Sequence, residues 1–234
     1  MGRLAAIWRK EFKDYFVSPI AYMVIAIFLL ITGWFFFSSF FVQGQASLRS
    51  FFQLLPMIFA FVIPALTMRL FSEEFNVGTF EMLATLPLTL RDIVISKFLA
   101  GLSFVAAMLL PTLSYPLFIS LMGNLDWGPV AGGYLGALLL GGAFTAIGLL
   151  TSALTKNQII AFILGTLFCF ILAIVDKMLF FFPQSILDFV QYFAADYHFQ
   201  NFAKGIIDSR DILYFLSLIF IGLYITHLLL QARE

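Results

Sequence analysis

The chain has 234 residues, of which 62% are hydrophobic and 11% are charged. Soluble domains carry about 25% charged residues, so this composition indicates a membrane protein and excludes disordered, nucleic-acid-binding and ordinary cytosolic classes. The formal net charge is zero, so no overall charge favours a polyanionic partner, and we expect no nucleic acid among the partners. The single cysteine, Cys169, excludes an intramolecular disulfide.

The apolar residues are grouped into six segments that are long enough to cross a bilayer. A helix that spans a hydrocarbon core of about 30 Å needs about 20 apolar residues. The six segments are Ile20–Val42, Phe51–Met68, Phe98–Met122, Val130–Leu154, Ile159–Val175 and Ile212–Leu230. Ser18 followed by Pro19 is typical of a helix start before the first of them. The sequence therefore predicts an all-α polytopic membrane protein, with residues 1–234 forming one transmembrane domain.

The basic residues between the predicted spans are unequally distributed. One side holds nine of them, namely Arg3, Arg9, Lys10, Lys13, Arg69, Arg91, Lys97, Lys156 and Arg233. The other side holds four, namely Arg49, Lys177, Lys204 and Arg210. Because loops rich in Lys and Arg stay in the cytoplasm, both termini are predicted to be cytoplasmic.

The segments outside the spans leave little room for chemistry. The two longest, 67–97 inside and 176–211 outside, are too short for an independent catalytic domain. The sequence contains no phosphate-loop, HExxH or GxSxG motif. The two histidines, His198 and His227, are predicted to lie on opposite sides of the membrane. We therefore expect no catalytic residue, no metal site and no directly bound cofactor in this chain.

The cores of the six spans contain no Asp, Glu, Lys or Arg. Carriers driven by protons or sodium usually place ionisable groups near the middle of the membrane. Their absence disfavours a carrier that works alone, although some sodium sites use only carbonyl and hydroxyl oxygens.

Residues 3–16 are predicted to form an amphipathic helix in the membrane interface. Its apolar stripe consists of Leu4, Trp8, Phe12 and Tyr15, and the cations Arg9, Lys10 and Lys13 lie elsewhere around the helix. Trp8 and Phe12 are expected to enter the interface while the cations face lipid phosphates. The pattern fits a membrane anchor, and it also fits an anchor that serves a cytoplasmic partner.

The inner segment 67–97 has the pattern of one or two short helices. Ser72 precedes Glu73 and Glu74, which places acids in a first helical turn. Gly78-Thr79 breaks and restarts the chain, and Pro87 ends the second helix. Thr89 and Asp92 resemble a capping box that opens the third span. The three acids Glu73, Glu74 and Glu81 fit either a docking surface or an ordinary solvated face.

The fourth span carries small residues along one side. Gly132 and Gly136 are spaced by four residues, as are Ala137 and Gly141, and this pattern allows another helix to approach closely. Packing within the chain is the favoured interpretation, and packing across a subunit boundary is the alternative.

The outer segment 176–211 has the period of two short amphipathic helices. Its apolar positions are Ile186, Phe189, Val190, Phe193, Phe199, Phe202 and Ile206, and Asp188, Asp196, His198 and Lys204 interrupt them. The two helices fit either a lid over the outer mouth or segments half-inserted in the outer interface.

In their order along the chain, these features resemble the membrane subunit of ABC-2-type transporters, which have the type V ABC exporter fold. Trp8-Arg9-Lys10-Glu11-Phe12 and Ser18-Pro19-Ile20-Ala21-Tyr22 resemble the elbow helix and the entry to the first span. The pattern Glu73-Glu74, Gly78-Thr79-x-Glu81, Leu86-Pro87 and Lys97-Phe98 is similar to the segment that holds the family's coupling helix. His198-Phe199, Gly205-x-x-Asp208 and Asp211 resemble the family's outer helical segment. The most similar subgroup comprises permeases associated with gliding motility and with copper processing.

The resemblance implies a permease without enzymatic activity, in the inner membrane of a bacterium. Its partners are then a nucleotide-binding ATPase subunit that binds ATP and Mg²⁺, a second copy or a paralogous permease, and membrane lipid. The expected ATPase-coupling residues are Glu73, Glu74, Gly78, Thr79 and Glu81, with Lys156 and Asn157 as a secondary contact. The carboxylates are expected to pair with basic residues of the ATPase. A carrier or channel that works alone, and a membrane anchor for an ATPase, are the alternatives.

Overall fold

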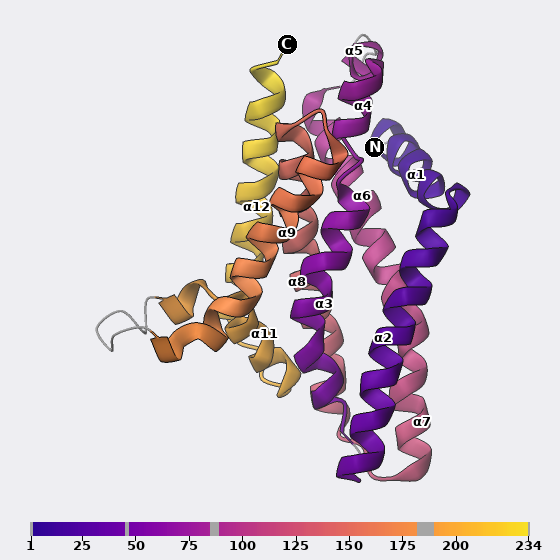
Figure 1. Ribbon diagram of the computed structural model, residues 1–234, viewed down its shortest axis with the longest axis vertical. Coiled ribbons are helices and arrows are strands. Elements are labelled where there is room, and N and C mark those ends of the chain that lie inside the picture. The colour runs from indigo at the N-terminus through magenta and orange to yellow at the C-terminus, as the bar shows by residue number, and fades with distance from the viewer. Residues whose placement is uncertain (1, 45–46, 85–88, 182–189, 234) are drawn as a thin grey trace.

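The computed structural model describes residues 2–44, 47–84, 89–181 and 190–233, and within these ranges the chain is helical without strands (Figure 1). Six helices of the described chain are long and apolar enough to span a membrane. They are α2 (Pro19–Gln43), α3 (Arg49–Thr67), α6 (Leu90–Leu109) with its continuation, α8 (Trp127–Leu154), α9 (Gln158–Ile174) and α12 (Ser209–Gln231). The predicted all-α polytopic membrane fold is thereby confirmed.

The third spanning helix starts at the predicted capping box, before the apolar segment Phe98–Met122 begins. It begins at Leu90 rather than at Phe98, because the capping box forms: the Thr89 hydroxyl accepts from the Asp92 amide and the Asp92 carboxylate accepts from the Thr89 amide. The charged residues before Phe98 therefore lie on the helix rather than in a loop.

The same spanning segment changes its helix type near its middle. A 3₁₀ turn, η1 (Leu110–Leu113), follows α6 and leads into α7 (Ser114–Met122). Pro111 lies in this turn, and proline cannot donate the backbone hydrogen bond that a continuous α-helix requires. The Thr112 side chain and carbonyl contact the Tyr134 hydroxyl at 3.0 and 2.8 Å, which holds the turn against α8.

Helix α8 is the centre of the bundle because small residues let its neighbours approach. It packs against α12, α3, α9, α11 and α6. A methyl group on Gly132 would lie 2.6 Å from the Phe202 carbonyl oxygen, and one on Gly141 would lie 2.7 Å from the Val105 side chain. A methyl group on Gly136 would lie 2.6 Å from Phe202. All three glycines therefore lie at contacts within the chain.

The remaining elements lie toward the two ends of the bundle. Helices α1 (Gly2–Val17), α4 (Ser72–Val77) and α5 (Thr79–Ala84) lie at the same end as the C-terminus, here called the α4 end (Figure 1). A 3₁₀ helix, η2 (Val175–Phe181), follows α9, and α11 (Ala195–Ala203) packs against α8 in the half of the bundle away from α4.

The outer segment is only partly within the described ranges. Ile186, Asp188 and Phe189 of the first expected helix lie outside the described residues, as do Leu86 and Pro87 of the inner segment. In the second expected helix, Phe199 and Phe202 are fully buried between α11 and the bundle, whereas Ile206 is exposed. The buried side of α11 therefore faces protein.

Candidate functional site

The α4 end carries two short helices whose boundaries follow from local sequence. Helix α4 ends at Val77 and is capped by Gly78, whose φ of +81° lies in the left-handed region and whose amide donates to the Glu74 carbonyl at 2.9 Å. Glycine adopts this conformation without steric cost. Helix α5 restarts at Thr79 with Glu81 in its first turn. The predicted break at Gly78-Thr79 is confirmed.

The start of α4 is capped by a side chain from another helix. The residue before α4 is Phe71, which offers no capping side chain. Instead the Ser152 hydroxyl of α8 accepts from the Phe71 and Ser72 amides at 3.0 and 3.1 Å and donates to the Met68 carbonyl at 2.8 Å. Because unpaired amides at a helix start are costly when buried, Ser152 ties the α3–α4 joint to the central helix.

Aromatic rings join the two short helices to each other. The Phe75 ring lies 4.9 Å from the Phe80 ring and 6.0 Å from the Phe71 ring. The Arg233 guanidinium lies 4.5 Å from the Phe75 ring centre and donates to the Leu154 carbonyl at 2.9 Å. The chain segment after α12 therefore contacts both α4 and the end of α8.

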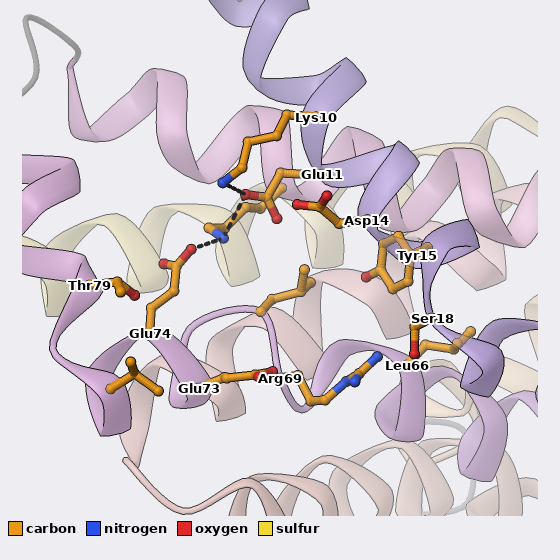
Figure 2. A pocket seen from close by; sticks show the side chains of 13 residues that line it. Lys10, Glu11, Asp14, Tyr15, Ser18, Leu66, Arg69, Glu73, Glu74 and Thr79 are labelled. Atoms are coloured by element: carbon orange, nitrogen blue, oxygen red, sulfur yellow. Dashed lines mark hydrogen bonds and ion pairs between the residues drawn. The ribbon is translucent and has the colours of Figure 1, made fainter.

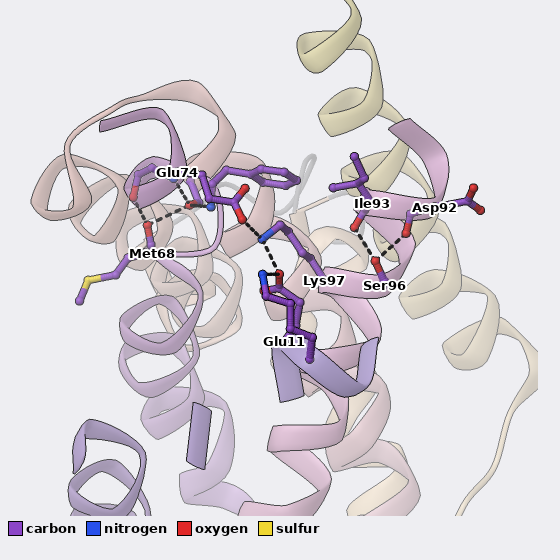
Figure 3. A network of polar contacts seen from close by, with 11 residues as sticks. Glu11, Met68, Glu74, Asp92, Ile93, Ser96 and Lys97 are labelled. Carbon is purple, nitrogen blue, oxygen red and sulfur yellow. Dashed lines mark hydrogen bonds and ion pairs between the residues drawn. The ribbon is translucent and has the colours of Figure 1, made fainter. Parts of the chain in front are cut away.

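A buried lysine connects three helices of this end (Figure 3). The Lys97 ammonium of α6 lies 2.6 Å from Glu74 Oε1 of α4 and 3.1 Å from Glu11 Oε1 of α1. The Lys97 side chain is 1% exposed, and the two carboxylates are 10% and 15% exposed. We call Glu11, Lys97 and Glu74 the polar triad. A buried charge is tolerated only when it is paired, so the triad constrains the relative positions of α1, α4 and α6.

A cavity of about 420 Å³ opens beside the polar triad, between α1 and the α3–α4 joint (Figure 2). Its polar lining includes Asp14, Arg69 and Glu73 in addition to the triad. The buried Tyr15 hydroxyl also lines it and has no hydrogen-bond partner among the described residues. Burial raises the pKa of the Tyr15 hydroxyl well above its usual range, so the group stays protonated at neutral pH.

The predicted coupling residues separate into an exposed set and one inward residue. The exposed set consists of Glu73, Gly78, Thr79, Glu81, Lys156 and Asn157. Asn157 caps α9 by accepting from the Ile159 amide at 2.9 Å. Glu74, expected to face a partner, instead turns toward Lys97 within the chain, because the buried ammonium requires a counter-charge.

The apolar side of the amphipathic helix α1 contacts the bundle. Trp8 donates to the Ser103 hydroxyl of α6 at 3.0 Å, and the Tyr15 ring lies 5.0 Å from the Phe104 ring. The half-buried Trp8 and Phe12 therefore pack against the core of the bundle, and the expected contact of their exposed parts with the membrane interface stays a prediction. The cations Arg9, Lys10 and Lys13 are exposed, as predicted for the other side of the helix.

Glu11, Lys97 and Ser152 were not among the site residues predicted from the sequence. A signal for the first two exists in the helical spacing. Glu11 shares a stripe with Leu4, Trp8 and Tyr15, and Lys97 is spaced four residues after the buried Ile93. A charged residue on the buried side of a helix requires a partner. Ser152 gives no such signal, because its role depends on the approach of α4.

A second buried polar cluster lies at the α11 helix, away from α4. His198 Nδ1 lies 2.6 Å from Asp211 Oδ1, and Asn201 donates to Asp211 Oδ2 at 2.9 Å. His198 Nε2 lies 3.0 Å from the Tyr192 carbonyl, and the Tyr214 ring stacks on the imidazole. This cluster fastens α11 to the start of α12.

The fold and the α4 end define a polytopic α-helical membrane protein in which short helices at one end are joined to the spanning helices by polar contacts. The profile of a family described as ABC-2 family transporter protein matches residues 5–230. The chain therefore belongs to this family, whose members are membrane permease subunits of ABC transporters. Permeases of this family generally work with an ABC ATPase as a partner. None of the curated proteins compared with the chain matches it.

Proposed function

We propose that this chain couples ATP hydrolysis by a separate nucleotide-binding subunit to export across a bacterial inner membrane. In this proposal the α4 end faces the cytoplasm, both termini are cytoplasmic, and a second copy or a paralogue completes the pathway. ATP and Mg²⁺ bind to the partner subunit, so this chain holds no cofactor. Membership of the subgroup associated with gliding motility or copper processing stays a prediction.

The observation that carries the proposal is the polar triad. A partner that moves α4 also acts on the buried Lys97 through Glu74, and hence on the spanning helix α6 and on α1. When two packed helices share a buried ion pair, moving one without the other leaves a buried charge unpaired, which is energetically unfavourable. The two helices are therefore expected to move together. The triad thus offers a short mechanical path from a surface helix to a membrane helix.

The docking surface in this proposal is the exposed part of the α4 end. Glu73 and Glu81 project from the two short helices, and Val77 between them is 67% exposed. Lys156 lies in the adjacent connection between α8 and α9, and α4 contacts both of those helices. This surface thus has acidic and basic side chains around the exposed Val77. Such a surface can form ion pairs with a polar partner surface while Val77 is buried in the interface.

The first experiment tests docking with charge reversals. The tagged full chain is purified gently from its native membrane, and soluble chains with a phosphate-loop motif are identified in the complex. Glu73→Lys, Glu81→Lys and Lys156→Glu are expected to reduce the amount of this partner. Lys204→Glu is the matched control for Lys156→Glu, because Lys204 is also exposed but follows α11. Purification of the chain without any nucleotide-binding partner under several mild conditions would favour a carrier or channel that works alone.

The second experiment separates coupling from simple anchoring. Lys97→Met leaves the exposed carboxylates in place but removes the centre of the polar triad. We expect the partner to remain bound while stimulation of its ATPase activity by the membrane subunit is lost. Unchanged stimulation in a folded Lys97→Met complex contradicts the coupling path and favours an anchor.

A further inference from the structure

A groove between α6 and α12 has apolar walls and a basic rim. It has a volume of about 380 Å³, and Val94, Ile95 and Leu223 form part of its walls. Arg91 and His227 also line it. No carboxylate is among its lining residues in the described chain, so the only charge at the groove is positive.

Both basic side chains at the rim have unused binding capacity. Arg91 is exposed in the first turn of α6 and makes no ion pair with any residue that the structure describes. His227 Nδ1 is buried and has no hydrogen-bond partner in the described part of the chain. A buried polar atom without a partner is uncommon in a folded protein, and here it lies in the same groove as an unpaired guanidinium.

The groove lies on the sides of two helices that are expected to be surrounded by lipid. Its two walls are helices that span the membrane. Arg91 lies near the start of α6 and His227 near the end of α12, so the basic rim is close to the end of both spans. Tyr224, 53% exposed, also lines the groove one helical turn before His227, and tyrosine is enriched at the interface between hydrocarbon and headgroups.

We propose that this groove binds an anionic phospholipid of the surrounding bilayer. One acyl chain lies between α6 and α12 against Val94, Ile95 and Leu223. The phosphate contacts the Arg91 guanidinium, whose planar donors match phosphate oxygens, and accepts a hydrogen bond from His227 Nδ1. Apolar walls below a basic rim are complementary to the chain and the headgroup of such a lipid.

The test measures lipid that remains bound to the full-length complex. The complex is reconstituted in nanodiscs of phosphatidylcholine and phosphatidylglycerol, released, and analysed by native mass spectrometry. Arg91→Gln is expected to reduce retained phosphatidylglycerol about fivefold, the effect of losing one favourable basic contact near the membrane surface. Arg210→Gln is the matched control, because Arg210 is also exposed and lies on α12 but in its first turn, away from the groove, so this variant should retain the lipid.

A second variant tests the acyl-chain part without changing charge. Ile95→Trp fills the groove and should reduce retention of both lipids, whereas Ile163→Trp on the exposed side of α9 should not. Retention by Arg91→Gln equal to that of the unchanged chain overturns the proposal. A disulfide between two copies of an Ile95→Cys variant also overturns it, because a second chain then covers the groove.

Discussion

Lys97 and Glu74 are separated by 23 positions in the sequence, yet their side chains meet at 2.6 Å. The contact joins a helix that spans the membrane to a short helix at its end. Since Glu11 reaches the same ammonium at 3.1 Å, three helices share one buried cation. The stability of the α4 end therefore depends strongly on a single lysine.

Replacement of Lys97 by methionine should lower the stability of the protein in detergent. The variant keeps most of the side-chain volume but leaves two carboxylates buried without their cation, which costs about 3–5 kcal/mol. The measurement is the midpoint of thermal unfolding. Lys10→Met is the matched control, because Lys10 approaches Glu11 only to 3.9 Å and its side chain is 64% exposed. Equal midpoints for the two variants would show that the triad does not hold the helices together.

Replacement of Ser152 by alanine should loosen the start of α4. The Phe71 and Ser72 amides lose the hydroxyl that accepts from them, whereas the Met68 carbonyl still accepts from the Ser72 hydroxyl. Leaving buried backbone groups unpaired costs about 1–3 kcal/mol. Hydrogen exchange of the Phe71 and Ser72 amides should accelerate. Ser120→Ala, which removes an exposed hydroxyl bonded only within its own helix, should leave that exchange unchanged.

Replacement of Gly132 by alanine should separate α8 from α11. The added methyl group meets the Phe202 carbonyl oxygen at 2.6 Å, so the backbone of one helix must shift. Overpacking of this kind costs about 1–3 kcal/mol. The corresponding change at Gly128 serves as the control, because the nearest atom lies 3.4 Å away. Thermal unfolding should distinguish the two variants, and a stable Gly132→Ala protein contradicts the close contact.

Replacement of His198 by phenylalanine should destabilise the attachment of α11 to α12. The ring can still stack on Tyr214, but among the residues that the structure describes Asp211 keeps only Asn201 as a side-chain partner. Removal of one hydrogen-bond partner from a buried carboxylate costs about 1–3 kcal/mol. The double variant His198→Phe with Asp211→Asn should recover part of the loss, since it no longer buries a carboxylate. No recovery in unfolding measurements would contradict a direct interaction between the two side chains.

Much of the fold could be predicted from local patterns. Six apolar segments predicted six spanning helices, and Ser18-Pro19 and Thr89 with Asp92 predicted two helix starts that the structure confirms. The apolar segment of the third span begins only at Phe98, because an apolar window stops at a lysine whereas a helix continues through one that is paired. The break at Gly78-Thr79 was predictable because only glycine adopts a positive φ readily.

The site was less predictable because it depends on contacts between distant segments. Glu73 and Glu81 are exposed as a local pattern of acids suggests, but Glu74, adjacent to Glu73, turns inward. Nothing in the local sequence distinguishes the two carboxylates, since both lie in the first turn of the same short helix. Only the position of Lys97 decides which of them becomes buried.

The sequence by itself determined that this chain has six helices long and apolar enough to cross a membrane, where most of them begin and end, and that short helices follow the second one. These properties depend on hydrophobicity, glycine, proline and capping residues that act within a few positions along the chain. The tertiary structure decided which charges are buried together, which glycines meet which helices, and that Ser152 caps a helix from another part of the chain. Such contacts form only when helices distant in sequence pack, because a buried charge or amide takes its partner from whichever helix lies beside it.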